Sequence, residues 1–473
     1  MSGMEQVVGS RRRNRLTALI VACALFMQNL DSTVISTALP TMARAFGADP
    51  THMNVALTSY MLSLAVFIPC SGWLADRFGT RTVFRAAIVI FTLGSVLCGS
   101  ANSLPFLVCA RVLQGFGGVM MVPVGRLLLL RTVPKSELVA AMAWLSTPAL
   151  LGPVLGPPLG GFVVTYFDWR FIFGINIPIG ILGVVLVTLF VEDVRETTRT
   201  DFDWRGFFLS STALASLMFA METIGRGVVP KSVSLAFLAL GAVAGVFYVA
   251  HARRHVRPII DFTLLRIPTF AVAVCAGTLF RIGIGAVPFL LPMMLQLTFG
   301  QSAAQSGLIT FASSLGALVM KPAATTALRR LGFRDTLVYN GVLSAVLLSL
   351  CAWFSPNWPV FLIYTALLTG GFFRSLQFTA YNALAYADVP RERMSSATGF
   401  YSAMQQISLT IGVSVAAASL TVTMALTDHD LPLLGDFSVA FLVVSFISLS
   451  AAPFALAMPR GAATELSGHR HQA

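Results

Sequence analysis

The sequence predicts an all-helical integral membrane protein. Of its 473 residues, 56% are hydrophobic and only 11% are charged, whereas about a quarter of the residues of a soluble domain are charged. Apolar stretches recur along the whole chain, and each is long enough to cross a hydrocarbon core of ~30 Å, which takes about 20 helical residues. We therefore expect a multi-pass protein with no sizeable soluble domain.

Hydropathy and loop residues divide the chain into fourteen predicted membrane helices. Lys and Arg are concentrated in the termini and in alternate loops, which favours an even number of helices and places both termini in the cytoplasm. The predicted helices start near residues 15, 53, 82, 105, 138, 170, 204, 232, 268, 304, 334, 358, 393 and 436.

Composition excludes several other classes of protein. The net charge is +12, but the basic residues form short clusters between apolar segments, which indicates membrane topology and not nucleic-acid binding. The 6 cysteines show no metal-ligand or CxxC spacing, so we expect no metal site and no cofactor. The basic cluster RRRNR precedes an apolar run that is too long for a signal peptide, which predicts an uncleaved first helix.

Two pairs of segments indicate an internal repeat. GWLADRFGTRTVF (72–84) aligns with TTALRRLGFRDTL (325–337), and VPKSELVAAMAW (133–144) aligns with VPRERMSSATGF (389–400), at offsets of 253 and 256 residues. Repeated halves are typical of transporters that bind their cargo between the halves at mid-membrane. The predicted organisation is a cytoplasmic N-terminus (1–14), a six-helix bundle (15–192), a linker with two extra helices (193–267), a second six-helix bundle (268–460) and a cytoplasmic tail (461–473).

Five motifs resemble those of the major facilitator superfamily, and specifically its fourteen-helix branch of drug:proton antiporters. They are LDSTVISTALP (30–40), GWLADRFGTR (72–81), ARVLQGFGG (110–118), GPVLGPPLGG (152–161) and DWRFIFGINIPIGI (168–181). The resemblance implies a major facilitator fold of two six-helix bundles plus two inserted helices. It also implies a monomeric, multi-pass protein of the bacterial inner membrane that exports small amphipathic molecules or drugs in exchange for protons.

Asp31 is the main candidate for proton coupling. A carboxylate near the middle of a membrane helix costs roughly 2.5 kcal/mol or more against lipid, so we expect it to face protein or water. Counting the helical rise places Asp31 and Arg111 of the fourth helix on the same side of mid-membrane. The guanidinium favours an ionised Asp31 and burial favours the protonated acid. Gln114, one turn from Arg111, is predicted to complete the network; a purely structural ion pair is the alternative.

Two motifs predict gating elements. In 72–81, Gly79 permits a tight turn, and resemblance to the family implies that Asp76 latches the outward-facing state; Arg131 is its candidate partner. In 152–161, glycines spaced by about four residues predict a smooth helix face for close packing, and prolines bend the backbone. The predicted gating residues are Gly72, Asp76, Arg77, Gly79, Arg81, Arg131, Gly152, Pro153, Gly156, Pro157, Gly160 and Gly161.

Five basic residues fall within the predicted helices, where each must face protein or water. They are Arg111, Arg126, Arg281, Lys321 and Arg374, against only two embedded acids, Asp31 and Glu222. This excess of positive charge makes export of organic anions or polycarboxylates the alternative to export of lipophilic cations. The predicted substrate-binding residues are Phe280, Arg281, Lys321, Phe373, Arg374, Gln377, Tyr381 and Gln405.

Other function classes fit the sequence less well. There is no GxxxxGK[ST] loop for an ATP-driven pump, and no histidine lies centrally in a predicted helix to support catalysis by a membrane enzyme. The repeated halves favour a rocking carrier over a channel. Among carriers, a proton-coupled importer is the second alternative, because only the resemblance of the fifth-helix motif argues for export.

Overall fold

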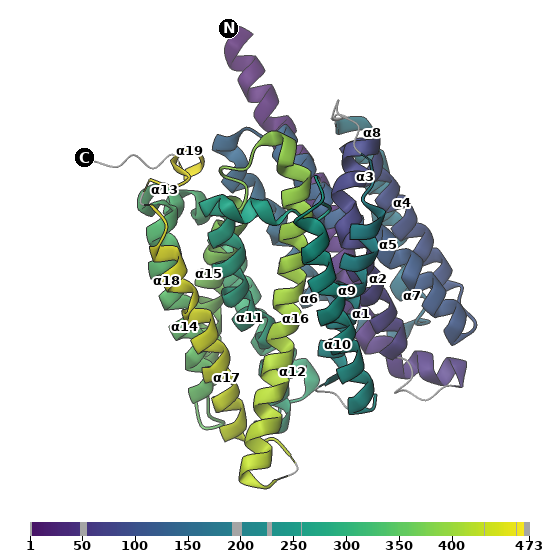
Figure 1. The fold of residues 1–473 in the computed structure, drawn as a ribbon. Helices are drawn as coiled ribbons and strands as arrows, with labels where there is room; N and C mark the ends of the chain where they lie inside the picture. The colour runs from purple at the N-terminus through teal and green to yellow at the C-terminus, as the bar shows by residue number, and fades with distance from the viewer. Residues whose placement is uncertain are drawn as a thin grey trace.

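The structure is a computed structural model that describes residues 2–47, 54–191, 201–224, 229–256, 258–429, 431–459 and 461–467. In these ranges all regular secondary structure is helical. Eleven of the described helices are long and apolar enough to cross a membrane. The prediction of an all-helical membrane protein is therefore confirmed, with apolar helices along the whole chain (Figure 1).

The first half of the chain forms one bundle of helices (Figure 1). Its elements are α1 (Ser2–Phe46), α2 (Asn54–Phe67), η1 (Ile68–Cys70), α3 (Ser71–Phe78), α4 (Thr80–Gly99), α5 (Leu104–Thr132), α6 (Lys135–Tyr166), α7 (Phe171–Gly174) and α8 (Asn176–Phe190). α1 packs most extensively on α6, and α4 packs on α5.

Two further helices, α9 (Trp204–Ile224) and α10 (Lys231–Ala252), form an antiparallel pair ahead of the second half of the chain. The second half contains η2 (Phe262–Arg266), α11 (Pro268–Leu297), α12 (Ala303–Met320), η3 (Lys321–Ala323), α13 (Ala324–Asp335), η4 (Thr336–Asn340), α14 (Gly341–Ser349), η5 (Leu350–Trp353), α15 (Val360–Leu384), η6 (Arg391–Arg393), α16 (Met394–Thr427), α17 (Leu434–Leu449), α18 (Ala451–Leu456) and α19 (Thr464–Ser467).

Both ends of the described chain lie at one end of the molecule, which we call the terminal end (Figure 1). α1 begins at Ser2, and the candidate membrane span within it begins at Leu16, next to the predicted start near residue 15. At the other end of the chain, residues 464–467 form α19, which packs on α6 and α13 instead of extending as a free tail. Residues 192–200, at the predicted start of the linker, lie outside the described residues.

The two halves share a turn at the position where their sequences align. Gly79 separates α3 from α4 with φ 89°, and Gly332 interrupts the second-half segment with φ 73°. Residues with a Cβ rarely adopt this left-handed region, so glycine is required at both turns. The predicted tight turn at Gly79 is therefore present, and its counterpart supports the internal repeat.

Glycines of the fifth-helix motif let α6 approach α1 closely. A Cβ added at Gly152 would lie 2.7 Å from the Cβ of Asn29, and one added at Gly156 would lie 2.1 Å from Oγ1 of Thr33. Gly160 is also buried, whereas a Cβ at Gly161 would meet nothing within 4 Å. Gly161 does not belong to the packing face, because nine residues at about 100° each turn it to the opposite side of the helix from Gly152.

The side chains of Pro153 and Pro157 lie outside the described residues, although the backbone of α6 runs continuously through both positions. The bend that the sequence predicts from these prolines is therefore a prediction still.

We expect Gly152→Ala to destabilise the protein by about 1–3 kcal/mol, the usual range for overpacking a tight site. The added methyl group would meet the Cβ of Asn29 and the backbone nitrogen of Leu30, at 2.7 and 2.8 Å. Thermal unfolding of the purified protein in detergent measures this effect. Gly161→Ala on the same helix is the matched control and should melt like the wild type. Equal melting temperatures for the two variants would contradict the packing described above.

Candidate functional site

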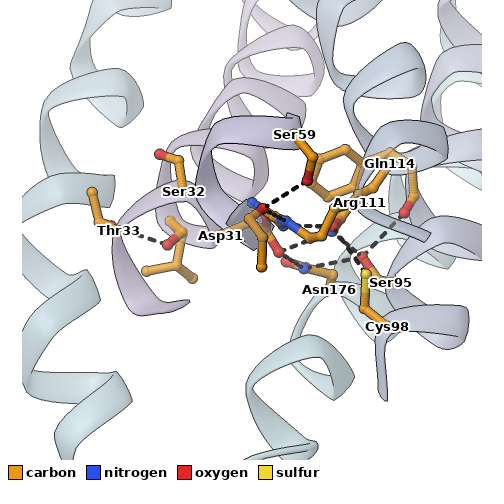
Figure 2. Close-up of polar contacts among 12 residues, drawn as sticks. Asp31, Ser32, Thr33, Ser59, Ser95, Cys98, Arg111, Gln114 and Asn176 are labelled. Carbon is orange, nitrogen blue, oxygen red and sulfur yellow. Dashed lines mark hydrogen bonds and ion pairs between the residues drawn. The ribbon is translucent and has the colours of Figure 1, made fainter. Parts of the chain in front are cut away.

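Asp31 lies at the centre of a buried polar network between α1, α4, α5 and α8 (Figure 2). Its Oδ2 forms an ion pair of 2.6 Å with Nη1 of Arg111, and neither side chain is exposed. Its Oδ1 accepts hydrogen bonds from Nε2 of Gln114 at 2.9 Å and from Nδ2 of Asn176 at 2.8 Å. The contacts predicted for Asp31, Arg111 and Gln114 are all present.

The remaining members of the network hold these three donors in place. Arg111 also donates to Oε1 of Gln114 at 2.6 Å and to the carbonyl of Ala56 at 3.3 Å. Its guanidinium carbon lies 4.2 Å from the centre of the Tyr60 ring, a favourable cation–π distance. Ser95 accepts from Gln114 at 2.8 Å and from Asn176 at 3.1 Å. Asp31 is thus bonded directly to groups from α5 and α8, and through Gln114 and Asn176 to Ser95 of α4.

Sequence reasoning missed Asn176, Ser95 and Tyr60. Asn176 stands in the apolar motif 168–181, and an amide in a membrane helix is itself a signal, because it needs a hydrogen-bond partner when it is removed from water. The cost of a buried charge, which singles out Asp31 and Arg111, does not apply to an uncharged amide. Only the fold shows that Asn176 bonds to Asp31.

The glycine face of α6 lies directly behind this acid. Gly152 and Gly156 contact residues on either side of Asp31, and Oγ1 of Thr33 donates to the carbonyl of Gly152 at 3.2 Å. A shift of α6 along α1 would therefore move the backbone that carries Asp31. A carboxylate held by one guanidinium and two amides can exchange its charge for a proton once these donors move.

Asp76 forms a second ion pair at the terminal end. Its Oδ1 lies 2.6 Å from Nη2 of Arg131 on α5, the predicted partner. Its Oδ2 accepts a hydrogen bond from Ser395 of α16, in the other half of the chain. Gly72 allows the close approach, because a Cβ there would lie 2.7 Å from the carbonyl oxygen of Ser395. We call Asp76, Arg131 and Ser395 the latch.

The two other arginines of this motif take different positions. Arg77 is exposed, and Arg81 donates to the carbonyl of Thr188 at the end of α8. Neither residue belongs to the latch as the structure shows it. Arg81 joins α4 to α8 within the first half of the chain.

Asp76→Asn should weaken the contact between the two halves at the terminal end, because it removes the charge from the side chain that accepts the hydrogen bond of Ser395. A loss of about 1 kcal/mol from this partly buried hydrogen bond shifts a two-state equilibrium roughly fivefold. Spin labels on cysteines at Phe78 and Arg391, both exposed, measure the separation. We expect a broader and longer distance distribution in the variant, and an unchanged distribution would count against the latch.

The predicted substrate-binding residues fall into several groups. Arg281, which is fully buried on α11, donates to the hydroxyl of Tyr401 and lies 4.7 Å from the centre of that ring. Arg126 of α5 reaches the same ring from the first half of the chain, at 5.5 Å. Gln405 accepts from Arg126 at 3.1 Å. We call Arg126, Arg281, Tyr401 and Gln405 the interface cluster.

The interface cluster contains two cationic side chains and no acidic side chain. Among the described residues, no carboxylate forms an ion pair with Arg126 or Arg281. The partners of Arg126 are the neutral groups of Tyr386, Ser402 and Gln405, at 3.1 to 3.4 Å. Its Nε, and the Nε and Nη1 of Arg281, are buried with no hydrogen-bond partner. Buried donors without a hydrogen-bond partner cost free energy of folding, and a bound anion would satisfy these guanidinium groups.

Phe280 and Tyr381 pack together beside the interface cluster, with ring centres 5.7 Å apart. The other predicted residues join helices of the second half. Gln377 accepts from Asn340 at 2.8 Å and donates to the carbonyl of Leu337, and Phe373 accepts from Asn340 through its carbonyl. Nζ of Lys321 donates to Thr379 at 3.2 Å.

Arg374 lies apart from the interface cluster. It donates to Ser313 of α12 and to the carbonyl of Gly370. It also lines a cavity of about 10 Å³ with residues that include Val287 and Leu348, which has room for about one water molecule. Both Arg281 and Arg374 were predicted to bind substrate, but their positions in the sequence carry no information on which side of the bundle each faces.

The model of the Major Facilitator Superfamily matches residues 21–277 and 272–471. The chain belongs to this superfamily. It is 40% identical over 403 residues to MdtD of Escherichia coli (strain K12) and to MdtD of Shigella sonnei (strain Ss046), each described as a candidate multidrug resistance protein. These matches cover 85% of this chain and 85% of each relative. The chain is therefore a multi-pass transporter of small molecules and not an enzyme.

Solved structures of the superfamily share the fold. The human organic anion transporter MFSD10 is 15% identical, with a TM-score of 0.66 over 93% of this chain and 99% of that one. The proton:xylose symporter XylE is 14% identical, with a TM-score of 0.66 over 97% of this chain and 98% of that one. At these identities the likeness concerns the fold alone.

Proposed function

We propose that the chain is a proton-coupled antiporter that exports small amphipathic molecules across the bacterial inner membrane by alternating access. The observation that carries this proposal is the buried network around Asp31, whose carboxylate is paired with Arg111 inside the bundle. Replacing such a pair by apolar residues is often neutral or stabilising, so a contribution to stability is a weak explanation for the presence of the pair. Proton exchange is a stronger explanation. The likeness to MdtD, described as a multidrug resistance protein, supports export.

We infer that fourteen helices cross the membrane, with both termini in the cytoplasm. The eleven apolar spans include one of 49 residues, Gln305–Trp353, which would extend about 74 Å as a straight helix and exceeds two hydrocarbon cores of ~30 Å. Its turn at Gly332 supports two antiparallel crossings. α6, with 32 residues, and α9, with 21, are the other two candidates for crossing.

The proposed cycle couples Asp31 to the latch. With the terminal end in the cytoplasm, the contact of Asp76 with Arg131 and Ser395 closes the cytoplasmic side, so this conformation corresponds to the outward-facing state. A proton from outside neutralises Asp31 and releases Arg111 from its ion pair. The bundles then rock, the latch opens, and the proton leaves to the cytoplasm as cargo binds. The states of the cycle differ in whether the Asp31 carboxyl group beside α6 is charged or neutral.

Proteoliposomes with an imposed pH gradient test the direction of coupling. Ethidium, a lipophilic cation, and benzoate, an organic anion, serve as cargo probes. Antiport predicts that cargo moves out of the compartment into which protons flow, and that a protonophore abolishes this movement. Movement of cargo and protons in the same direction would instead identify the importer that the sequence left open.

A second candidate function is export of organic anions or polycarboxylates. It is favoured by the interface cluster, in which Arg126 and Arg281 present buried donors with no partner. The cluster joins α5 of the first half to α11 and α16 of the second, and cargo sites of repeated-half transporters lie at such an interface. A carboxylate there would accept from guanidinium groups of both halves.

Ligand-induced thermal stabilisation distinguishes the two kinds of cargo. If the cargo is anionic, di- and tricarboxylates should raise the melting temperature of the wild type, and tetraphenylphosphonium should not. Arg281→Met should weaken this response at least about tenfold, since a charge-assisted hydrogen bond contributes roughly 1.5–3 kcal/mol. Arg374→Met is the matched control, because Arg374 contacts α12 outside the cluster. Stabilisation by the cation alone would reject anionic cargo.

A further inference from the structure

Three potential metal ligands meet at the terminal end of the inserted helix pair. Asp203 immediately precedes α9, His251 lies in the last turn of α10, and His255 follows α10 by three residues. One ligand atom from each side chain lies within 4.8 Å of the other two. The network around Asp31 and the interface cluster contain none of these residues. Asp203 is 48 residues from His251 in the sequence, so only the fold brings it to the two histidines.

Only one of the two oxygens of the buried Asp203 carboxylate has hydrogen-bond partners. Oδ1 of Asp203 accepts from the backbone nitrogen of Gly206 at 2.8 Å and lies 2.8 Å from Nε2 of His251. Oδ2 is buried without a hydrogen-bond partner, and Nδ1 of His255 lies 4.0 Å away. The Asp203 residue is 5% exposed. A buried carboxylate oxygen in this position calls for a cation between it and the facing ring nitrogen.

The ligand types and the access both suit a transition-metal ion. Imidazole nitrogen and carboxylate oxygen are ordinary zinc ligands, and three protein ligands leave a fourth position for water. The Gly206 nitrogen orients the carboxylate, as outer partners of metal ligands commonly do. His255 is exposed, which gives an ion a path from solvent. Arg205, Arg253 and Arg254 are also exposed, so solvent screens their repulsion of a cation.

We propose that Asp203, His251 and His255 form a binding site for one divalent transition-metal ion, with Zn²⁺ as the best-matched ion. The ion would join the start of α9 to the end of α10. α9 is itself bonded to both halves of the chain, through Ser211 to the carbonyl of Val66 and through Ser414 to the carbonyl of Met221. The site therefore fastens the helix pair that bridges the two bundles.

Zinc titration of the full chain in detergent, purified without a histidine tag and stripped with a chelator, tests this proposal. We expect one saturable Zn²⁺ site per chain, and a rise in melting temperature with occupancy. His251→Ala and His255→Ala should each weaken binding at least about tenfold, because even outer partners of metal ligands contribute 10- to 100-fold. His429→Ala is the matched control: His429 also faces a buried carboxylate, that of Asp436, but without a second histidine.

A second measurement uses Co²⁺ as a spectroscopic probe of the same site. Co²⁺ bound by two imidazoles and a carboxylate in a low-coordinate site gives visible absorption bands that Zn²⁺ abolishes by displacement. We expect such bands from the wild type at one equivalent of Co²⁺. Their absence, or zinc binding by the His251→Ala/His255→Ala double variant equal to that of the wild type, would overturn the proposal.

Discussion

Asp31→Asn should reduce cargo transport driven by a pH gradient to the background of protein-free liposomes. Asparagine keeps the size of the side chain and can still accept hydrogen bonds from Gln114 and Asn176, the neutral donors to Oδ1. It cannot take up or release a proton at physiological pH. Uptake of a cargo probe into proteoliposomes, under the same gradient for wild type and variant, measures the loss.

The control for this prediction is folding. The variant should elute from size exclusion as the wild type does, since the network keeps its amide and hydroxyl members. Asp436→Asn, at a buried acid that accepts from the backbone nitrogen of Leu433 far from the network, should retain gradient-driven transport. Wild-type transport by Asp31→Asn would remove this acid from the mechanism.

Arg111→Met should destabilise the protein by about 3–5 kcal/mol, the usual cost of removing one partner of a buried ion pair. Methionine fills much of the volume beside the Tyr60 ring, so the loss of charge dominates. Asp31 would then be a buried carboxylate without a cation. The thermal midpoint in detergent reports the destabilisation.

The double variant Asp31→Asn/Arg111→Met separates charge from packing. If the cost of Arg111→Met comes from the unpaired carboxylate, neutralising Asp31 should recover most of the lost stability. A double variant as unstable as Arg111→Met alone would show that the packing of the guanidinium matters more than its charge.

The network around Asp31 was predictable because two simple quantities determine it. The cost of a charge in lipid singled out Asp31 and Arg111, and the helical rise placed both at one depth. The spacing of three residues between Arg111 and Gln114 predicted their shared face. The latch partner Arg131 followed from its place at the end of a helix.

The contacts of the predicted substrate-binding residues were less predictable, because the depth of a residue in the membrane does not determine which way its side chain points. Arg281 and Arg374 were both predicted to bind substrate; Arg281 contacts Tyr401, and Arg374 contacts Ser313. Helix rotation depends on packing between helices that are distant in sequence. For the same reason the bond of Arg126 to Gln405, which joins the two halves, became visible only in the fold.

Infrared difference spectroscopy of the reconstituted protein tests the central claim most directly. The carbonyl stretch of a protonated carboxyl group identifies an acid that gains a proton as the pH falls. We predict a band in the wild type that is missing from Asp31→Asn and present in Asp436→Asn. A band that persists unchanged in Asp31→Asn would contradict the claim that this buried acid carries the transported proton.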